Sequence, residues 1–84
     1  MKNIRLTRHA REQCLERGAS EAEIKEAIEK GSQEPAKHGR KIYKYNFAFD
    51  SNWHGKRYAI KQVVPVVKEE DREIVVITVY TFYF

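Results

Sequence analysis

The sequence has a single cysteine, Cys14, and only two prolines and four glycines among its 84 residues. One cysteine excludes an internal disulfide, leaves a cysteine-based zinc cage short of ligands and favours a reducing compartment. No segment approaches the roughly 20 apolar residues of a membrane helix, and the opening residues MKNIRLTRHARE lack the apolar core of a signal peptide. We therefore expect a cytoplasmic protein with no membrane partner.

The length and composition are those of one small folded domain. A chain of this size buries only about 60–65% of the surface that its unfolded form exposes, so its core is modest. The sequence is 42% hydrophobic and 33% charged, which is typical of globular proteins. Its net charge of +4 favours a polyanionic partner such as RNA, because lysines and arginines that neutralise phosphates release counterions. A charge that serves solubility alone explains the same number.

Two helices are predicted near the N-terminus, as a helical hairpin over residues 7–31. Thr7 is suited to be an N-cap, because the ten residues after it contain no proline, glycine or β-branched residue. Gly18 then closes the first helix in the left-handed conformation. Ser20 followed by Glu23 has the pattern of a capping box, which starts a second helix that ends at the next glycine.

The rest of the chain predicts a sheet. Residues 32–40 form a polar loop, and residues 41–84 are rich in aromatic and β-branched side chains interrupted by turn residues. This spacing predicts three antiparallel strands in a meander, at about 41–50, 56–67 and 73–83. The fold class is therefore α+β, a single domain over residues 1–84 in which two helices pack on a three-stranded or slightly larger antiparallel sheet.

Alternation along the strands predicts one apolar face beneath the helices and one open face. In the middle strand, the set expected to face the helices is Tyr58, Ile60 and Val64. The open face is then cationic and hydroxyl-bearing, and it collects Lys44, Asn46, Arg57, Lys61, Thr78 and Tyr80. The C-terminal residues TVYTFYF have apolar side chains on both faces, so we expect a partner or a second copy of the chain to cover them, as in a homodimer through the C-terminal strand.

His9 is the strongest candidate for chemistry from the residues alone. It lies one helical turn before Gln13 and two before Arg17, along one line of the first helix. Imidazole titrates nearest neutral pH and serves as a general acid or base, while an arginine beside it can hold a phosphate. A solvated helical histidine is the more common situation. The three histidines and one cysteine match no zinc pattern, and there is no glycine-rich phosphate loop, so no metal or cofactor is expected.

Basic residues alternate with aromatic residues in the predicted strands. Lysines and arginines beside rings on which bases can stack suit single-stranded RNA. The candidate RNA-binding residues are Arg40, Lys44, Arg57 and Lys61. A soluble amphipathic sheet whose aromatics form its core explains most of the rings equally well.

The segment RLTRHAREQCLERGASEAEIKEAIEKG resembles the opening of a bacterial family, domain of unknown function 4258. The later segments YKYNF, KRYAIKQVVPVV and EIVVITVY are similar to the strands of that family. The resemblance implies a RelE-like fold in the superfamily of barnase, EndoU, colicin and RelE-type ribonucleases, many of them toxins held by an antitoxin or immunity protein. It implies a functional role for His9, Arg17, Thr78 and Tyr80. Ala19 departs from the family pattern, which usually has isoleucine or valine there.

The leading hypothesis is a metal-independent endoribonuclease that cleaves RNA by attack of the 2′-hydroxyl on the adjacent phosphorus. His9 transfers protons, Arg17 and Lys61 stabilise the phosphate, and Thr78 or Tyr80 orients the substrate. Helices on the core face would let His9 reach this site only around an edge or end of the sheet. The alternative is a noncatalytic module that binds RNA or protein through its basic sheet face.

Overall fold

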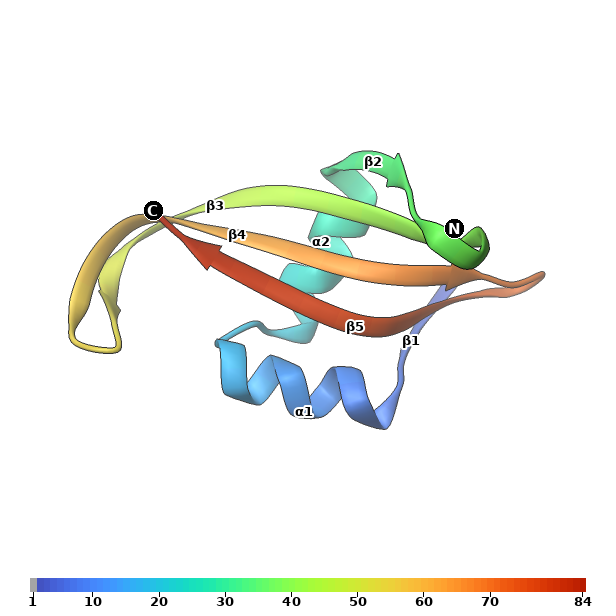
Figure 1. Ribbon diagram of the computed structural model, residues 1–84, viewed down its shortest axis with the longest axis horizontal. Coiled ribbons are helices and arrows are strands. Elements are labelled where there is room, and N and C mark those ends of the chain that lie inside the picture. Colours follow the sequence, from blue (N-terminus) through green and yellow to red (C-terminus); the bar gives the residue numbers. More distant parts are fainter. Residues whose placement is uncertain (1) are drawn as a thin grey trace.

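A computed structural model describes residues 2–84 of the protein as two helices lying against one face of a five-stranded sheet (Figure 1). The helices α1 and α2 are joined by a short turn, and the three long strands follow them in the chain. No helix within residues 2–84 is long and apolar enough to span a membrane. The elements are β1 (Asn3–Leu6), α1 (Arg8–Arg17), α2 (Glu21–Lys30), β2 (Ser32–Pro35), the 3₁₀ helix η1 (Lys37–Gly39), β3 (Lys41–Trp53), β4 (Lys56–Glu69) and β5 (Glu73–Tyr83).

The sheet has the strand order β1-β5-β4-β3-β2. The antiparallel meander β3–β4–β5 is the predicted one, and the α+β class is confirmed. Two short strands were not predicted. The first, β1, pairs with β5 in parallel, which makes the sheet mixed, and β2 pairs antiparallel with β3 in the stretch predicted as a loop. Both strands have four residues. Each is held in the sheet by a long strand: β1 by β5, which is distant in the sequence, and β2 by β3, which follows it in the chain.

The helix boundaries follow from the caps that the sequence predicts. The Thr7 hydroxyl accepts from the Ala10 amide at 3.1 Å, and Gly18 ends α1 with φ of +74°. Ser20 and Glu23 form the complete capping box at the start of α2. The glycine that ends α2, Gly31, has an ordinary φ of −75°. Its lack of a side chain matters because the backbone of β3 passes too close for a Cβ atom.

The core lies between the two helices and the sheet. The buried residues of α1 are Ala10 and Cys14, and α2 contributes Ile24, Ala27 and Ile28. Burial raises the pKa of the Cys14 thiol, so Cys14 behaves as a small apolar side chain in the core. The sheet completes the core with Tyr43, Val63, Val67, Ile74, Val76 and Val79.

The predicted faces of β4 and β5 are wrong over part of their length. Val63 and Val67 of β4 face the helices, so alternation turns Ile60 and Val64 to the open face, against the prediction. In β5, Ile77 is an extra residue between the pairs Val66–Thr78 and Val67–Val76. Ile74, Val76 and Val79 therefore all face the helices, although unbroken alternation would put Val79 on the other face. A pattern argument that assumes unbroken alternation therefore assigns the wrong face.

The far end of the β3–β4 hairpin curls toward the turn between the helices (Figure 1). His54 and Gly55 form its two-residue turn with φ values of +52° and +80°, so β3 extends past the predicted residue 50 to Trp53, while β4 begins at Lys56 as predicted. The ring of Trp53 stacks on Tyr83, with centroids 4.8 Å apart. A Cβ atom on Gly18 would lie only 2.6 Å from the Trp53 ring, so the indole packs directly against the helix turn.

Candidate functional site

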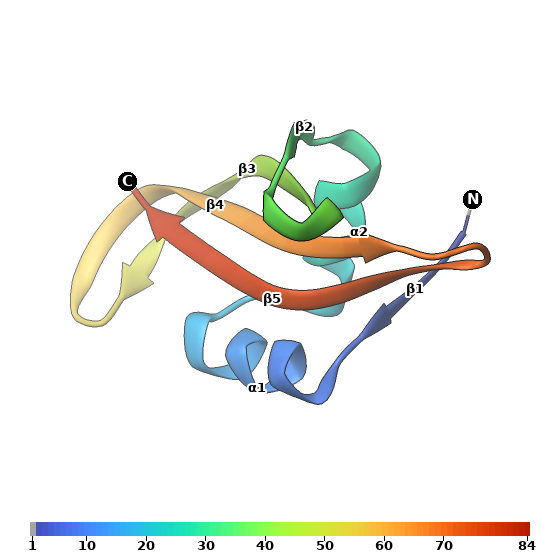
Figure 2. The same cartoon turned by 45° about the vertical axis from the view of Figure 1, so that its right-hand side comes forward.

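Helix α1 runs along the edge of β5 that no strand covers after β1 ends (Figure 2). The parallel pairing stops at Leu6 and Val76, and the Thr7 amide then donates to the Val76 carbonyl at 3.1 Å. The Thr7 hydroxyl donates to the next carbonyl, that of Ile77, at 3.3 Å. The chain thus passes from strand to helix while it stays against β5.

Two side chains of α1 supply the hydrogen bonds that a neighbouring strand would supply. The Gln13 side-chain oxygen accepts from the Val79 amide at 3.1 Å and also from the Thr78 hydroxyl. Arg17 donates to the Val79 carbonyl at 2.6 Å, and its guanidinium lies 4.9 Å from the centre of the Tyr80 ring. Three predicted site residues, Arg17, Thr78 and Tyr80, are therefore brought together, with Gln13 between them.

His9 lies one turn before Gln13 on the same line of α1, so their Cβ atoms are about 5–6 Å apart. Its side chain is exposed. The sequence indicated that His9 could reach the open face only around an edge or end of the sheet. Helix α1 lies along the edge of β5, so His9 is at such an edge (Figure 2). We call the set His9, Gln13, Arg17, Thr78 and Tyr80 the α1–β5 seam. It combines an imidazole, a guanidinium, an amide and two hydroxyls at one sheet edge.

Lys61 does not belong to the α1–β5 seam, and its predicted place on the open face is wrong. Its ammonium lies on the helix side of β4, 2.8 Å from the Gly18 carbonyl and 2.8 Å from the Glu23 carboxylate. The side chain is only 8% exposed. A buried ammonium must be paired, and these two acceptors satisfy it. Lys61 therefore fastens the helix turn to the sheet and is unavailable to a phosphate.

The open face differs from the cationic surface that was predicted. Lys44 is on it but is paired with Glu34 at 3.3 Å. The alternation of β4 breaks at Ala59 and Ile60, whose amides both donate to the Phe84 carbonyl. Tyr58 therefore turns its ring toward Tyr83 on the helix side, and Arg57 is exposed on the open face. Arg40 is exposed in the loop after η1. The surface between these cations is apolar and aromatic, and its most exposed members are Ile60, Tyr80, Phe82 and Phe84.

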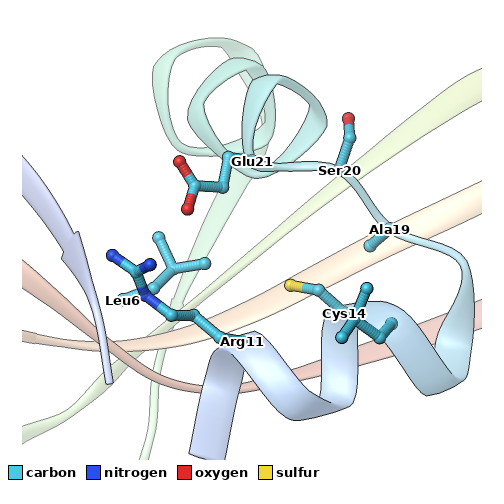
Figure 3. Close-up of a pocket in the computed structure, with 7 residues that line it drawn as sticks. Leu6, Arg11, Cys14, Ala19, Ser20 and Glu21 are labelled. Atoms are coloured by element: carbon cyan, nitrogen blue, oxygen red, sulfur yellow. The ribbon is translucent and has the colours of Figure 1, made fainter. Parts of the chain in front are cut away.

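A groove of about 440 Å³ lies on the other flank of α1, between α1 and the start of α2 (Figure 3). In Figure 3 the charged ends of Arg11 and Glu21 lie on one side of it, and Cys14 and Ala19 on the other. The raised pKa of the Cys14 thiol leaves no thiolate nucleophile there. Among the residues that the structure describes, no group of histidines, cysteines and carboxylates could hold a metal ion. The groove therefore has no imidazole and no reactive thiolate among its lining residues, whereas the α1–β5 seam combines an imidazole with a guanidinium.

The sequence placed Gln13 on the line of His9 and Arg17 but gave it no role, because its partner is a strand more than 60 residues away. The apolar residues on both faces of the C-terminal segment indicated that some of them would be exposed, and Phe82 and Phe84 are.

Comparison with known proteins identifies one family. Residues 6–81 match the family described as domain of unknown function (DUF4258), and this span contains every residue of the α1–β5 seam. No curated protein and no solved structure matches the chain.

Proposed function

This chain belongs to the family of domain of unknown function DUF4258, and from the residues gathered at the α1–β5 seam we propose that it is a metal-independent endoribonuclease. The observation that carries the proposal is the course of α1 along β5, which sets the line of His9, Gln13 and Arg17 beside Thr78 and Tyr80. As part of the same proposal, the fold is RelE-like and the family lies within the superfamily of barnase, EndoU, colicin and RelE-type ribonucleases.

The reaction needs groups that the α1–β5 seam can supply. The ribose 2′-oxygen loses its proton to a base and attacks the adjacent phosphorus. The bond from phosphorus to the 5′-oxygen then breaks, and an acid gives that oxygen a proton. The products are a 2′,3′-cyclic phosphate and a free 5′-hydroxyl. Negative charge builds up on the phosphate oxygens in the transition state, where hydrogen-bond donors and cations lower its energy.

Each residue has a role in this scheme. His9 transfers the protons, since it is the exposed acid–base group of the seam. Arg17 stabilises the phosphate. Its bond to the Val79 carbonyl and its place over the Tyr80 ring fix the guanidinium in one orientation and leave other N–H groups free to donate. Thr78 and Tyr80 position the ribose and phosphate. Lys61, which is buried and paired with Glu23, has no part in it.

The biological role that we attach to this activity is that of a cytoplasmic, toxin-like nuclease held by an antitoxin or immunity protein. A noncatalytic module that binds RNA or protein is the second candidate. It is favoured by one observation: Arg17 and Thr78 both make hydrogen bonds that cover the edge of β5, which is a structural task in itself.

The test is cleavage of a defined RNA by purified protein in the presence of a chelator. The enzyme leaves cyclic-phosphate ends, and His9→Ala slows cleavage about 10²–10⁴-fold, the usual contribution of one acid–base group. His38→Asn is the matched control, because His38 lies in η1 with φ of +62°, a conformation that asparagine tolerates. Its rate should equal that of the wild type.

Two results decide against the nuclease. Intact RNA with a salt-dependent gel shift would establish a binding module. Equal cleavage by the wild type and by correctly folded His9→Ala protein would remove His9 from the reaction.

A further inference from the structure

Three aromatic side chains stand in a row on the open face, beside the α1–β5 seam. Tyr80, Phe82 and Phe84 are 44%, 49% and 59% exposed. They are alternate residues of one extended segment, so they share a face at a spacing of about 7 Å. Phe84 keeps this register, because its amide and carbonyl both bond to Ile60 of β4. We call these three residues the aromatic row. Exposed large rings in a continuous row on a small domain mark a binding surface.

We propose that the aromatic row is a stacking platform for the unpaired bases of single-stranded RNA, which leads the strand into the α1–β5 seam. The proposal deepens the proposed function and rests on RNA being the substrate of that seam. Rings on the solvent face of a sheet hold two or three bases in other RNA-binding domains, and stacking accepts every base because each has a π face.

The ring at the centre of the aromatic row has polar neighbours, which suit a base. Phe82 lies directly opposite Gln62 on β4, and Gln62 lies opposite Asn46 on β3. The Gln62 amide therefore borders the central ring and the Asn46 amide lies one strand beyond it, and each can donate to and accept from the edge of a base. A protein partner that buried this face would have to satisfy both amides as well.

The charges at the two ends of the aromatic row are positive. Arg17 lies over the Tyr80 ring at one end, and Arg57 is exposed on the same face toward the other end. A phosphate backbone that follows the row meets a cation at each end, which is the complementarity that nucleic acid needs. A second copy of the chain docked here through a two-fold axis would bring arginines against arginines. That repulsion decides against self-association on this face.

Tyr80 connects the platform with the site of cleavage, because it belongs both to the aromatic row and to the α1–β5 seam. A base stacked on Tyr80 is beside the guanidinium of Arg17. The aromatic row thus extends from the α1–β5 seam in one direction, toward Phe84. Its three rings can stack with about three bases of the bound strand. Duplex RNA cannot use the row, since its bases are already stacked and paired.

The experiment measures the Kd of a fluorescein-labelled RNA of eight nucleotides with 2′-O-methyl riboses, which cannot undergo the transesterification. Fluorescence anisotropy compares the wild type with Phe82→Ala, Phe82→Leu and Phe84→Ala. Leu15→Ala is the control, because Leu15 is 86% exposed on α1 and outside the row. Each Phe→Ala variant should weaken binding roughly 5- to 150-fold, the range for one stacked base, and Leu15→Ala should not change it.

The Leu variant separates a stacking platform from an apolar docking face. Phe82→Leu keeps an apolar side chain and loses the π face, so it should bind nearly as weakly as Phe82→Ala. Far-UV circular dichroism confirms that these surface variants fold. The proposal is overturned if Phe82→Leu binds like the wild type, if a duplex of the same sequence binds as tightly as the single strand, or if no RNA binds. A dimer in light scattering that Phe82→Glu dissociates would show instead that the row is a self-interface.

The fate of the nuclease is distinguishable from that of the platform. If the protein binds the 2′-O-methyl RNA through Phe82 but never cleaves ordinary RNA, the proposed platform stands and the proposed nuclease activity is refuted. If cleavage depends on His9 and the Phe82→Ala variant has the same KM as the wild type, the proposed nuclease activity stands and the proposed platform is refuted.

Discussion

Replacing Gly18 by alanine tests how the tip of the β3–β4 hairpin is held against the helix turn. Gly18 has φ of +74°, where a residue with a Cβ atom costs about 1–2 kcal/mol. The new Cβ atom would lie 2.6 Å from the Trp53 ring and 2.8 Å from the Tyr83 hydroxyl. Forcing an extra methyl group into such a contact costs a further ~1–3 kcal/mol. We expect Gly18→Ala to lower the free energy of unfolding by about 3 kcal/mol.

The loss is measured by thermal unfolding, followed by far-UV circular dichroism. For a domain of this size, about 3 kcal/mol lowers Tm by roughly 12–24 °C. The control is Gly39→Ala. Gly39 has φ of +70° and no atom within 4 Å of the added Cβ, so it incurs the conformational cost alone. The protein's single tryptophan is Trp53, so its fluorescence reports whether the ring is displaced.

Equal losses in Gly18→Ala and Gly39→Ala would refute the packing of Trp53 against the turn. A second check uses Trp53→Ala as the background. With the indole removed, the cost of Gly18→Ala should fall toward that of Gly39→Ala, because most of the steric conflict has gone.

Four further outcomes follow from the contacts described. Lys61→Met should lower the free energy of unfolding by about 1–3 kcal/mol in urea, because its buried acceptors lose their donor, while the rate of RNA cleavage per folded molecule stays the same. Ser20→Ala should cost about 1 kcal/mol in the same assay through loss of the capping box. Arg5 of β1 pairs with Glu73 of β5 at 3.0 Å, and the pKa of Glu73 is lowered from 4.5, chiefly by its hydrogen bond from Arg5. Its contribution to stability is therefore present above about pH 4.5 and lost as the pH falls through the lowered value, and high salt should shrink that loss in acid unfolding curves. Cys14 should react with a disulfide reagent, followed by absorbance, only as fast as the protein opens, because the thiol is buried and its pKa is raised.

The helices were predictable because their boundaries depend on nearby residues. The Thr7 cap, the left-handed Gly18 and the Ser20–Glu23 capping box each involve residues within a few positions of one another, and all three are present. The meander was predictable for the same reason, since turn residues separate its strands. The strands β1 and β2 were missed because four residues without strong alternation become strands only through their partners.

The faces of the sheet were predicted less well than its strands. Assigning Lys61 to the open face assumed that a charged side chain avoids the core, and the pairing with Glu23 and the Gly18 carbonyl removes that penalty. Of the catalytic candidates, Arg17, Thr78 and Tyr80 do come together, through Gln13 and the Val79 backbone. No short-range pattern encodes such contacts, because they join residues about 60 positions apart.

The parallel pairing of β1 with β5 also bears on how the molecule folds and opens. Its partners, such as Asn3 and Glu73, lie at opposite ends of the chain, whereas β3 and β4 meet across a two-residue turn. Closing a loop of some 70 residues costs on the order of 4 kcal/mol in chain entropy, so β1 should dock late, after the hairpins have formed. The amides of β1 should accordingly exchange with deuterium sooner than those of β4, and opening there would loosen the helix that carries His9 before the sheet itself comes apart.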